Sequence, residues 1–202
     1  MKNLFKKIIL LGIAIIMFGC SKDDTPTSTP CVPITCLNGG VSTPNCGCTC
    51  PTGYTGNNCG TQITPSKIII TKIRVKKFPN FRTNGSNWDS FALAGWERPD
   101  IFPVLFNSSG TTVLYLGTPT ISDSFSYGND TFDFIPTTPI QITNPTSSFI
   151  LCLYDEDSST TQEEMGRINL PLYTSTGGFP TTITFGQSTD IVRFELTVSY
   201  VW

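Results

Sequence analysis

The stretch FILCLYDED at residues 149–157, continued by SSTTQEEMGRINLPL at 158–172, is the most informative part of the sequence about the fold of this chain. An apolar run of strand length ends in acidic residues, and after a short polar segment an apolar alternation resumes, which predicts two strands joined by a turn. Successive side chains of a strand alternate between its faces, so Asp155 and Asp157 point to one side and Glu156 to the other. Glu163 follows six residues after Asp157, where the chain returns.

Short alternating or apolar runs recur along the second part of the chain. In residues 71–75, charged Lys72 and Arg74 alternate with apolar Ile73 and Val75, as in a half-buried strand. Similar runs lie at 101–106, 112–116, 131–135, 149–154, 165–170, 181–185 and 191–201. Turn-forming clusters separate them, and the 17 glycines and 15 prolines oppose long helices. This pattern predicts an all-β fold, an eight-stranded antiparallel β-sandwich over residues 65–202.

The composition excludes several classes of function. The sequence has no histidine, which removes Ser-His-Asp and Cys-His nucleophile systems, a histidine general base and histidine metal ligands. Without Lys2, Lys6 and Lys7, which lie in a segment expected to be cleaved, ten basic side chains face 15 acidic ones. This excess of negative charge argues against a nucleic-acid partner. Carboxylate chemistry, cysteine chemistry and binding without catalysis remain.

The first twenty residues have the pattern of a targeting segment. Lys2, Lys6 and Lys7 precede an apolar run of eleven residues at 8–18, too short to span a membrane but suited to a signal peptide. The run ends in MFGC, which resembles the cleavage box of bacterial lipoproteins. The resemblance implies a lipoprotein signal peptide at 1–19 and lipidation of Cys20, which would anchor the protein in a membrane by its acyl chains. An ordinary signal peptide cleaved near Gly19 is the alternative.

Residues 20–30 are expected to form a tether, since SKDDTPTSTP has too little apolar surface to fold. Its lysine and paired aspartates resemble the signal by which some Gram-negative bacteria export lipoproteins to the outer face of the cell. We therefore expect an outer-membrane lipoprotein that faces the cell surface. The alternative is a purely solvated spacer.

Six cysteines crowd into 29 residues, a segment too small to fold without cross-links. Spacing alone leaves 15 pairings open, and zinc binding is the competing use of clustered cysteines. The segment CVPITCLNGGVSTPNCGCTCPTGYTGNNC resembles an EGF-like module through its NGG and its C-P-x-G-Y-x-G-x-x-C ending. The resemblance implies an EGF-like module at 31–60, with the pairs Cys31–Cys46, Cys36–Cys48 and Cys50–Cys59. Cys152 lies far from this cluster and is expected to be a buried free thiol.

The second part of the chain, over about residues 66–172, resembles a C2 domain, a calcium-dependent lipid-binding sandwich. The resemblance rests on a first strand, on PDIFPVLF, on NDTFDF and on FILCLYDED followed by E-x-x-G. It implies calcium ligands at Asp100, Asp155, Asp157 and Glu163. The family usually has a further aspartate where this chain has Ala94, so Asp89 is expected to replace it if the loop folds back. Acidic surface loops without a metal are the alternative.

Basic residues concentrate in and after the first predicted strand, at Lys67, Lys72, Arg74, Lys76, Lys77 and Arg82. A binding patch for an anionic surface is one interpretation. We favour a solvated outer strand face, because charged side chains there also prevent strand edges from pairing.

Three functions are compatible with these features. The first is a non-catalytic surface lipoprotein that presents the EGF-like module and the C2-like domain for calcium-supported adhesion or for binding a protein, glycan or phospholipid at the loop tip. The second is a carbohydrate-binding sandwich in which Trp88 and Trp96 stack on sugars without calcium. The third is a carboxylate-only hydrolase using Asp155 with Glu163, which is disfavoured because clustered carboxylates suit a cation better than a separated acid–base pair. We therefore expect no enzyme. Trp88, Phe91 and Trp96 either contact a ligand or pack beneath a loop.

Overall fold

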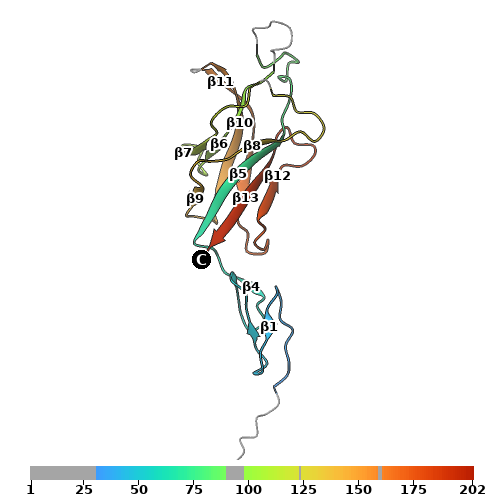
Figure 1. The fold of residues 1–202 in the computed structure, drawn as a ribbon, viewed down its shortest axis with the longest axis vertical. Coiled ribbons are helices and arrows are strands. Elements are labelled where there is room, and N and C mark those ends of the chain that lie inside the picture. The colour runs from blue at the N-terminus through green and yellow to red at the C-terminus, as the bar shows by residue number, and fades with distance from the viewer. Residues whose placement is uncertain (1–30, 90–97, 123, 159–160) are drawn as a thin grey trace, which may run out of the picture.

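The computed structural model describes residues 31–89, 98–122, 124–158 and 161–202. The expected signal peptide, Cys20, the tether, Phe91 and Trp96 lie outside these ranges. The described part is all-β, and its sheets are antiparallel (Figure 1). It contains no helix long and apolar enough to cross a membrane.

Two sheets form the larger part of the molecule. One has the order β11-β10-β6-β7, and the other has the order β12-β13-β5-β8, with β9 also paired to β5. The strands are β5 (Lys67–Lys77), β6 (Ile101–Phe106), β7 (Val113–Leu116), β8 (Phe132–Phe134), β9 (Ile140–Ile142), β10 (Ser148–Ser158), β11 (Thr161–Pro171), β12 (Thr182–Phe185) and β13 (Arg193–Val201). Each of the eight predicted runs overlaps one of these strands, and β9 is additional. The prediction of an antiparallel all-β fold is confirmed.

The core lies between the two sheets because both contribute alternate apolar side chains to it. Phe194 and Leu196 of β13 and Phe149 and Leu151 of β10 are at most 2% exposed and belong to one buried cluster. Cys152, also on β10, is 1% exposed and free, as the sequence predicts.

Strand β5 is longer than predicted and changes its inward face midway. Ile68 and Ile70 are buried, and so are Ile73 and Val75, which a strict alternation would place on the opposite face. The pairing of β5 with β13 shifts register at this point: Ile70 lies opposite Val198 and Lys72 opposite Thr197. The extra residue, Thr71, forms a β-bulge, which restores the apolar side chains to the core.

Residues 31–62, called the disulfide module below, pack against one end of the sandwich. The module contains β1 (Val41–Ser42), β2 (Cys48–Thr49), β3 (Tyr54–Thr55) and β4 (Thr61–Gln62). Its disulfides join Cys31 to Cys46, Cys36 to Cys48 and Cys50 to Cys59, the pairing that the EGF-like resemblance implied.

Aromatic rings form the contact between the disulfide module and the sandwich. The rings of Tyr54 and Phe179 meet edge to face with centroids 5.2 Å apart, and Phe179 packs in the same way on Trp202. Next to this contact, the Ser66 N–H donates to the Val201 carbonyl at 2.7 Å. The β10–β11 hairpin lies at the opposite end of the sandwich from this contact (Figure 1).

Candidate metal centre

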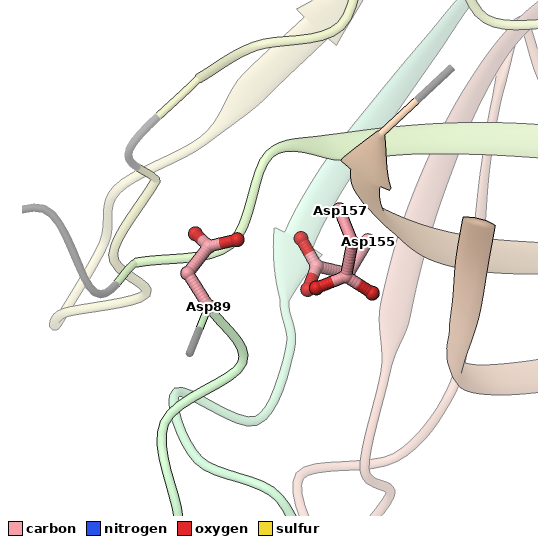
Figure 2. Close-up of side chains that lie close together, drawn as sticks. All are labelled: Asp89, Asp155 and Asp157. Atoms are coloured by element: carbon pink, nitrogen blue, oxygen red, sulfur yellow. The ribbon is translucent and has the colours of Figure 1, made fainter. Parts of the chain in front are cut away.

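Three aspartates meet at the end of the sandwich where β10 ends. Asp155 and Asp157 lie on β10, and Asp89 comes from the segment between β5 and β6 (Figure 2). One carboxylate oxygen from each lies within 4.8 Å of the others. The strand alternation that placed Asp155 and Asp157 on one side is compatible with this arrangement. Asp89 lies 66 positions before Asp155 in the sequence and reaches the cluster only through the path of its loop.

Asp155 is the buried member of the cluster. It is 0% exposed, while Asp89 is half-buried and Asp157 is exposed. Its Oδ1 accepts a hydrogen bond from the backbone N–H of Asp100 at 2.8 Å. Its Oδ2 is buried and has no hydrogen-bond partner. A buried carboxylate oxygen without a partner is costly, so this atom indicates that the site is suited to another group.

Burial raises the pKa of Asp155 to about 7, and the negative charges of Asp89, Asp157 and Asp100 act in the same direction. The hydrogen bond from Asp100 opposes this shift. The pKa of Asp157 is also raised, first by burial and then by Glu163, while Arg82 lowers it. The cluster therefore disfavours its own negative charge, as expected where carboxylates gather, even with Arg82 beside Asp157.

These residues fit a hard divalent cation. Calcium prefers six to eight oxygen ligands, including carboxylates, and the three aspartates offer carboxylate oxygens at one point. Asp155 belongs to this group, and a cation there would give its unpartnered Oδ2 a positively charged partner. Three carboxylates supply part of such a shell, so carbonyl or water oxygens would complete it.

Asp100 and Glu163, the other two predicted ligands, have contacts of a different kind. Both main-chain polar groups of Asp100 bond to β10. Its N–H donates to the Asp155 side chain, and its carbonyl accepts from the Glu156 N–H at 3.0 Å. Glu163 lies opposite Asp155 in the β10–β11 ladder, and its Oε2 accepts from Arg82 Nε at 2.7 Å. The three-oxygen group thus contains Asp89, Asp155 and Asp157 but neither of these two carboxylates.

Trp88 packs beneath the loop that leads to Asp89. It is 6% exposed, its Nε1 donates to the Pro79 carbonyl at 2.8 Å, and the Arg82 guanidinium lies over its ring, 5.5 Å from the centroid. Trp88 is thus packed within this segment, and it also lines a cavity together with Arg82 and Glu163. Arg82, which the sequence grouped only with the basic residues, contacts both this loop and Glu163.

The basic residues of β5 are paired on the outer face of their sheet. Arg74 bonds Asp133 at 2.6 Å and Glu195 at 3.3 Å, and Lys76 bonds Glu195 at 3.1 Å. Lys72 lies 3.5 Å from Asp133. Lys67 and Lys77 donate to the Gln141 side chain and to the backbone carbonyls of Ser188 and Asp190. This arrangement supports the solvated-face interpretation over an anion-binding patch.

Among the comparisons with known proteins, only the one with solved structures finds similar proteins. No family model matches the sequence, and no curated protein matches it. A structure described as a C2 domain is 13% identical, covers 66% of this chain and 97% of its own, and has a TM-score of 0.39. A C2 domain of plant extended synaptotagmin 1 is 17% identical over 67% of this chain and 93% of its own, with a TM-score of 0.36.

Human GIVD cytosolic phospholipase A2 is 22% identical, with a TM-score of 0.38. The match covers 69% of this chain but only 17% of the phospholipase. The chain is thus similar to C2 domains among solved structures, and the proposals below rest on its own residues.

Proposed function

We propose that this protein is a non-catalytic surface lipoprotein whose sandwich binds calcium through Asp89, Asp155 and Asp157 and presents that end for adhesion or ligand binding. The observation that carries the proposal is the buried, unpartnered Oδ2 of Asp155 within a group of three carboxylates. A divalent cation adds positive charge at this group, beyond that of Arg82 beside Asp157, and removes the repulsion among the three side chains.

The role of the cation is structural in this proposal. Asp155 and Asp157 are fixed by β10, whereas Asp89 belongs to a loop, so a shared cation would join the loop to the sheet. The cluster lies at the end of the sandwich opposite the disulfide module (Figure 1). In a protein attached by its N-terminus, this end would face away from the anchoring membrane. The partner class is a protein, glycan or phospholipid on an opposing surface.

A thermal melt of residues 21–202 tests the metal site, in millimolar calcium and in excess chelator. At ten times Kd, a cation stabilises a protein by about 1.4 kcal/mol, which raises the melting temperature by roughly 3–6 °C in a chain of this size. The double substitution Asp155→Asn with Asp157→Asn should abolish the rise. Glu156→Gln removes one charge from the same strand on its other face and should keep the rise. An equal melting temperature with and without calcium in the unmodified chain would sink the proposal.

Attachment by lipid is tested separately in a bacterium that expresses the whole chain. Metabolic labelling with a clickable fatty acid should mark the protein. Cys20→Ser should abolish the label and should shift the protein out of the membrane fraction. Cleavage by protease added to intact cells would support the outward orientation. Label retained in Cys20→Ser would contradict the assignment of the lipidated residue.

A further inference from the structure

An ion pair lies at the edge of the aspartate cluster and joins its loop to its sheet. Arg82 Nε donates to Glu163 Oε2 at 2.7 Å, and Arg82 Nη2 contacts the same oxygen. Arg82 Nη2 is also 3.9 Å from Asp157 Oδ1. The side chain of Arg82 is 23% exposed and that of Glu163 is 43% exposed, so solvent screens the pair mainly from the glutamate side.

The remaining contacts of Arg82 fix the chain just before Asp89. Its Nη1 donates to the Asn87 carbonyl at 2.5 Å, and its guanidinium covers the buried ring of Trp88. Its backbone closes a turn, since the Arg82 N–H donates to the Ser86 carbonyl at 2.9 Å. A planar guanidinium can hold several acceptors at once in a fixed geometry, which a lysine cannot do. The backbone just before Trp88 and the Trp88 ring are therefore tied to β11 through one side chain.

We infer that Arg82 is a positioning residue for the cation site: with Glu163 as its counter-ion, it holds residues 82–88 against β11 so that Asp89 reaches Asp155 and Asp157. This inference rests on the proposed calcium binding. It also gives Glu163 a role other than that of a direct ligand. Asp89 is the member of the cluster that a strand does not fix, so its position depends most on these contacts.

The direction in which calcium affinity changes when Arg82 is replaced distinguishes a positioning role from a purely electrostatic effect. A positive charge beside a cation site repels the cation, so removal of Arg82 would tighten calcium binding if charge alone mattered. If Arg82 positions Asp89, its removal weakens binding because the loop no longer presents the third carboxylate. The charge of Arg82 is offset by Glu163, which reduces the repulsion and leaves positioning as the larger effect.

Calcium affinity is measured by calorimetry on residues 21–202. Arg82→Ala should weaken binding about tenfold or more, and Arg82→Lys should give an intermediate loss. The matched control is Arg167→Ala, which removes a positive charge from β11 that pairs with Glu164. It should change the affinity less than about twofold. Arg82→Ala that binds calcium as tightly as the unmodified chain, or more tightly, overturns the inference while the proposed function stands.

A double-mutant cycle tests the role of Glu163. Glu163→Gln should weaken binding, and the double substitution with Arg82→Ala should be no worse than Arg82→Ala alone, because both act through one contact. If the double variant instead loses affinity by the product of the two single losses, Glu163 acts independently of Arg82, as a direct ligand would, and its part in the inference is contradicted.

A second readout keeps the inference testable without calcium. In excess chelator, chymotrypsin should cut after Trp88 at least about fivefold faster in Arg82→Ala than in Arg167→Ala or the unmodified chain. Equal cleavage rates overturn the positioning role. If the unmodified chain binds no calcium, the proposed function fails and the inference fails with it.

Discussion

The backbone N–H of Asp100 donates to the side chain of Asp155 at 2.8 Å, at the point where β6 begins beside the end of β10. The bond fixes one oxygen of a fully buried carboxylate and leaves the other without a partner. The position of Asp155 on β10 therefore keeps a carboxylate buried inside this end of the sandwich with one oxygen unpaired, and this burial disfavours its negative charge.

The burial of the Asp155 carboxylate predicts an unusual dependence of stability on pH in excess chelator. The pKa of Asp155 rises from its ordinary value of 3.8 to about 7 on folding. The folded state thus retains a proton that the unfolded state loses, and stability falls as pH rises from about 4 to about 7. Asp155→Asn should remove this fall and melt several degrees higher than the unmodified chain at pH 8. Chemical denaturation across this range measures it, with Glu156→Gln as the control. A substitution that lowers stability at pH 8 in chelator would contradict the prediction.

Two glycines of the disulfide module offer a test of its contact with the sandwich. Gly53 and Gly56 have nearly equal φ values, 89° and 91°, so alanine incurs a similar backbone strain at each. A Cβ on Gly53 would lie 2.6 Å from the Phe179 ring and 2.7 Å from the Trp202 ring, whereas a Cβ on Gly56 would have Thr61 at 3.4 Å as its nearest neighbour.

Gly53→Ala should therefore cost about 1–3 kcal/mol more than Gly56→Ala, since overpacking adds to the strain. Equilibrium unfolding followed by tryptophan fluorescence measures the difference. Equal losses of stability in the two variants would show that the disulfide module does not pack against the Phe179 and Trp202 rings in solution.

Cys152 should be chemically silent in the folded protein. It is 1% exposed, and burial raises the pKa of its thiol, with Glu164 acting in the same direction. In residues 21–202 the other six cysteines form disulfides, so a maleimide should label no thiol in the native state and one after denaturation. Cys152→Ser should destabilise more than Cys152→Ala, because the hydroxyl adds a buried polar group. Rapid labelling of the native protein is the result that opposes this prediction.

The outer face of β5 should bind polyanions only when its acidic partners are removed. Asp133 and Glu195 form ion pairs with Lys72, Arg74 and Lys76 in the folded protein. Asp133→Asn with Glu195→Gln should increase retention on a heparin column. Asp130→Asn with Glu156→Gln makes the same change in net charge away from β5 and serves as the control. Equal retention of the two double variants would mean that net charge, and not the paired face, governs the interaction.

The strand pattern was predictable because period-two alternation is a local property of the chain. The eight runs each overlap a strand, and Cys152 is buried and free as expected. Strand β9 was missed since its three residues, IQI, lie in a segment rich in proline and threonine that resembles a loop. The bulge at Thr71 was missed because a register shift becomes visible only when the partner strand β13 is in place.

An all-β chain, a cysteine-rich module and the shared side of Asp155 and Asp157 could be predicted, because each follows from composition or from neighbours along one strand. Which distant carboxylate joins these two depends on how the chain folds in three dimensions. The tertiary structure brought Asp89 into the cluster, paired Glu163 with Arg82 and used the main chain of Asp100. The physical reason is that a cation site is defined by oxygen atoms a few ångströms apart, and the paths of loops and the pairing of sheets set such distances.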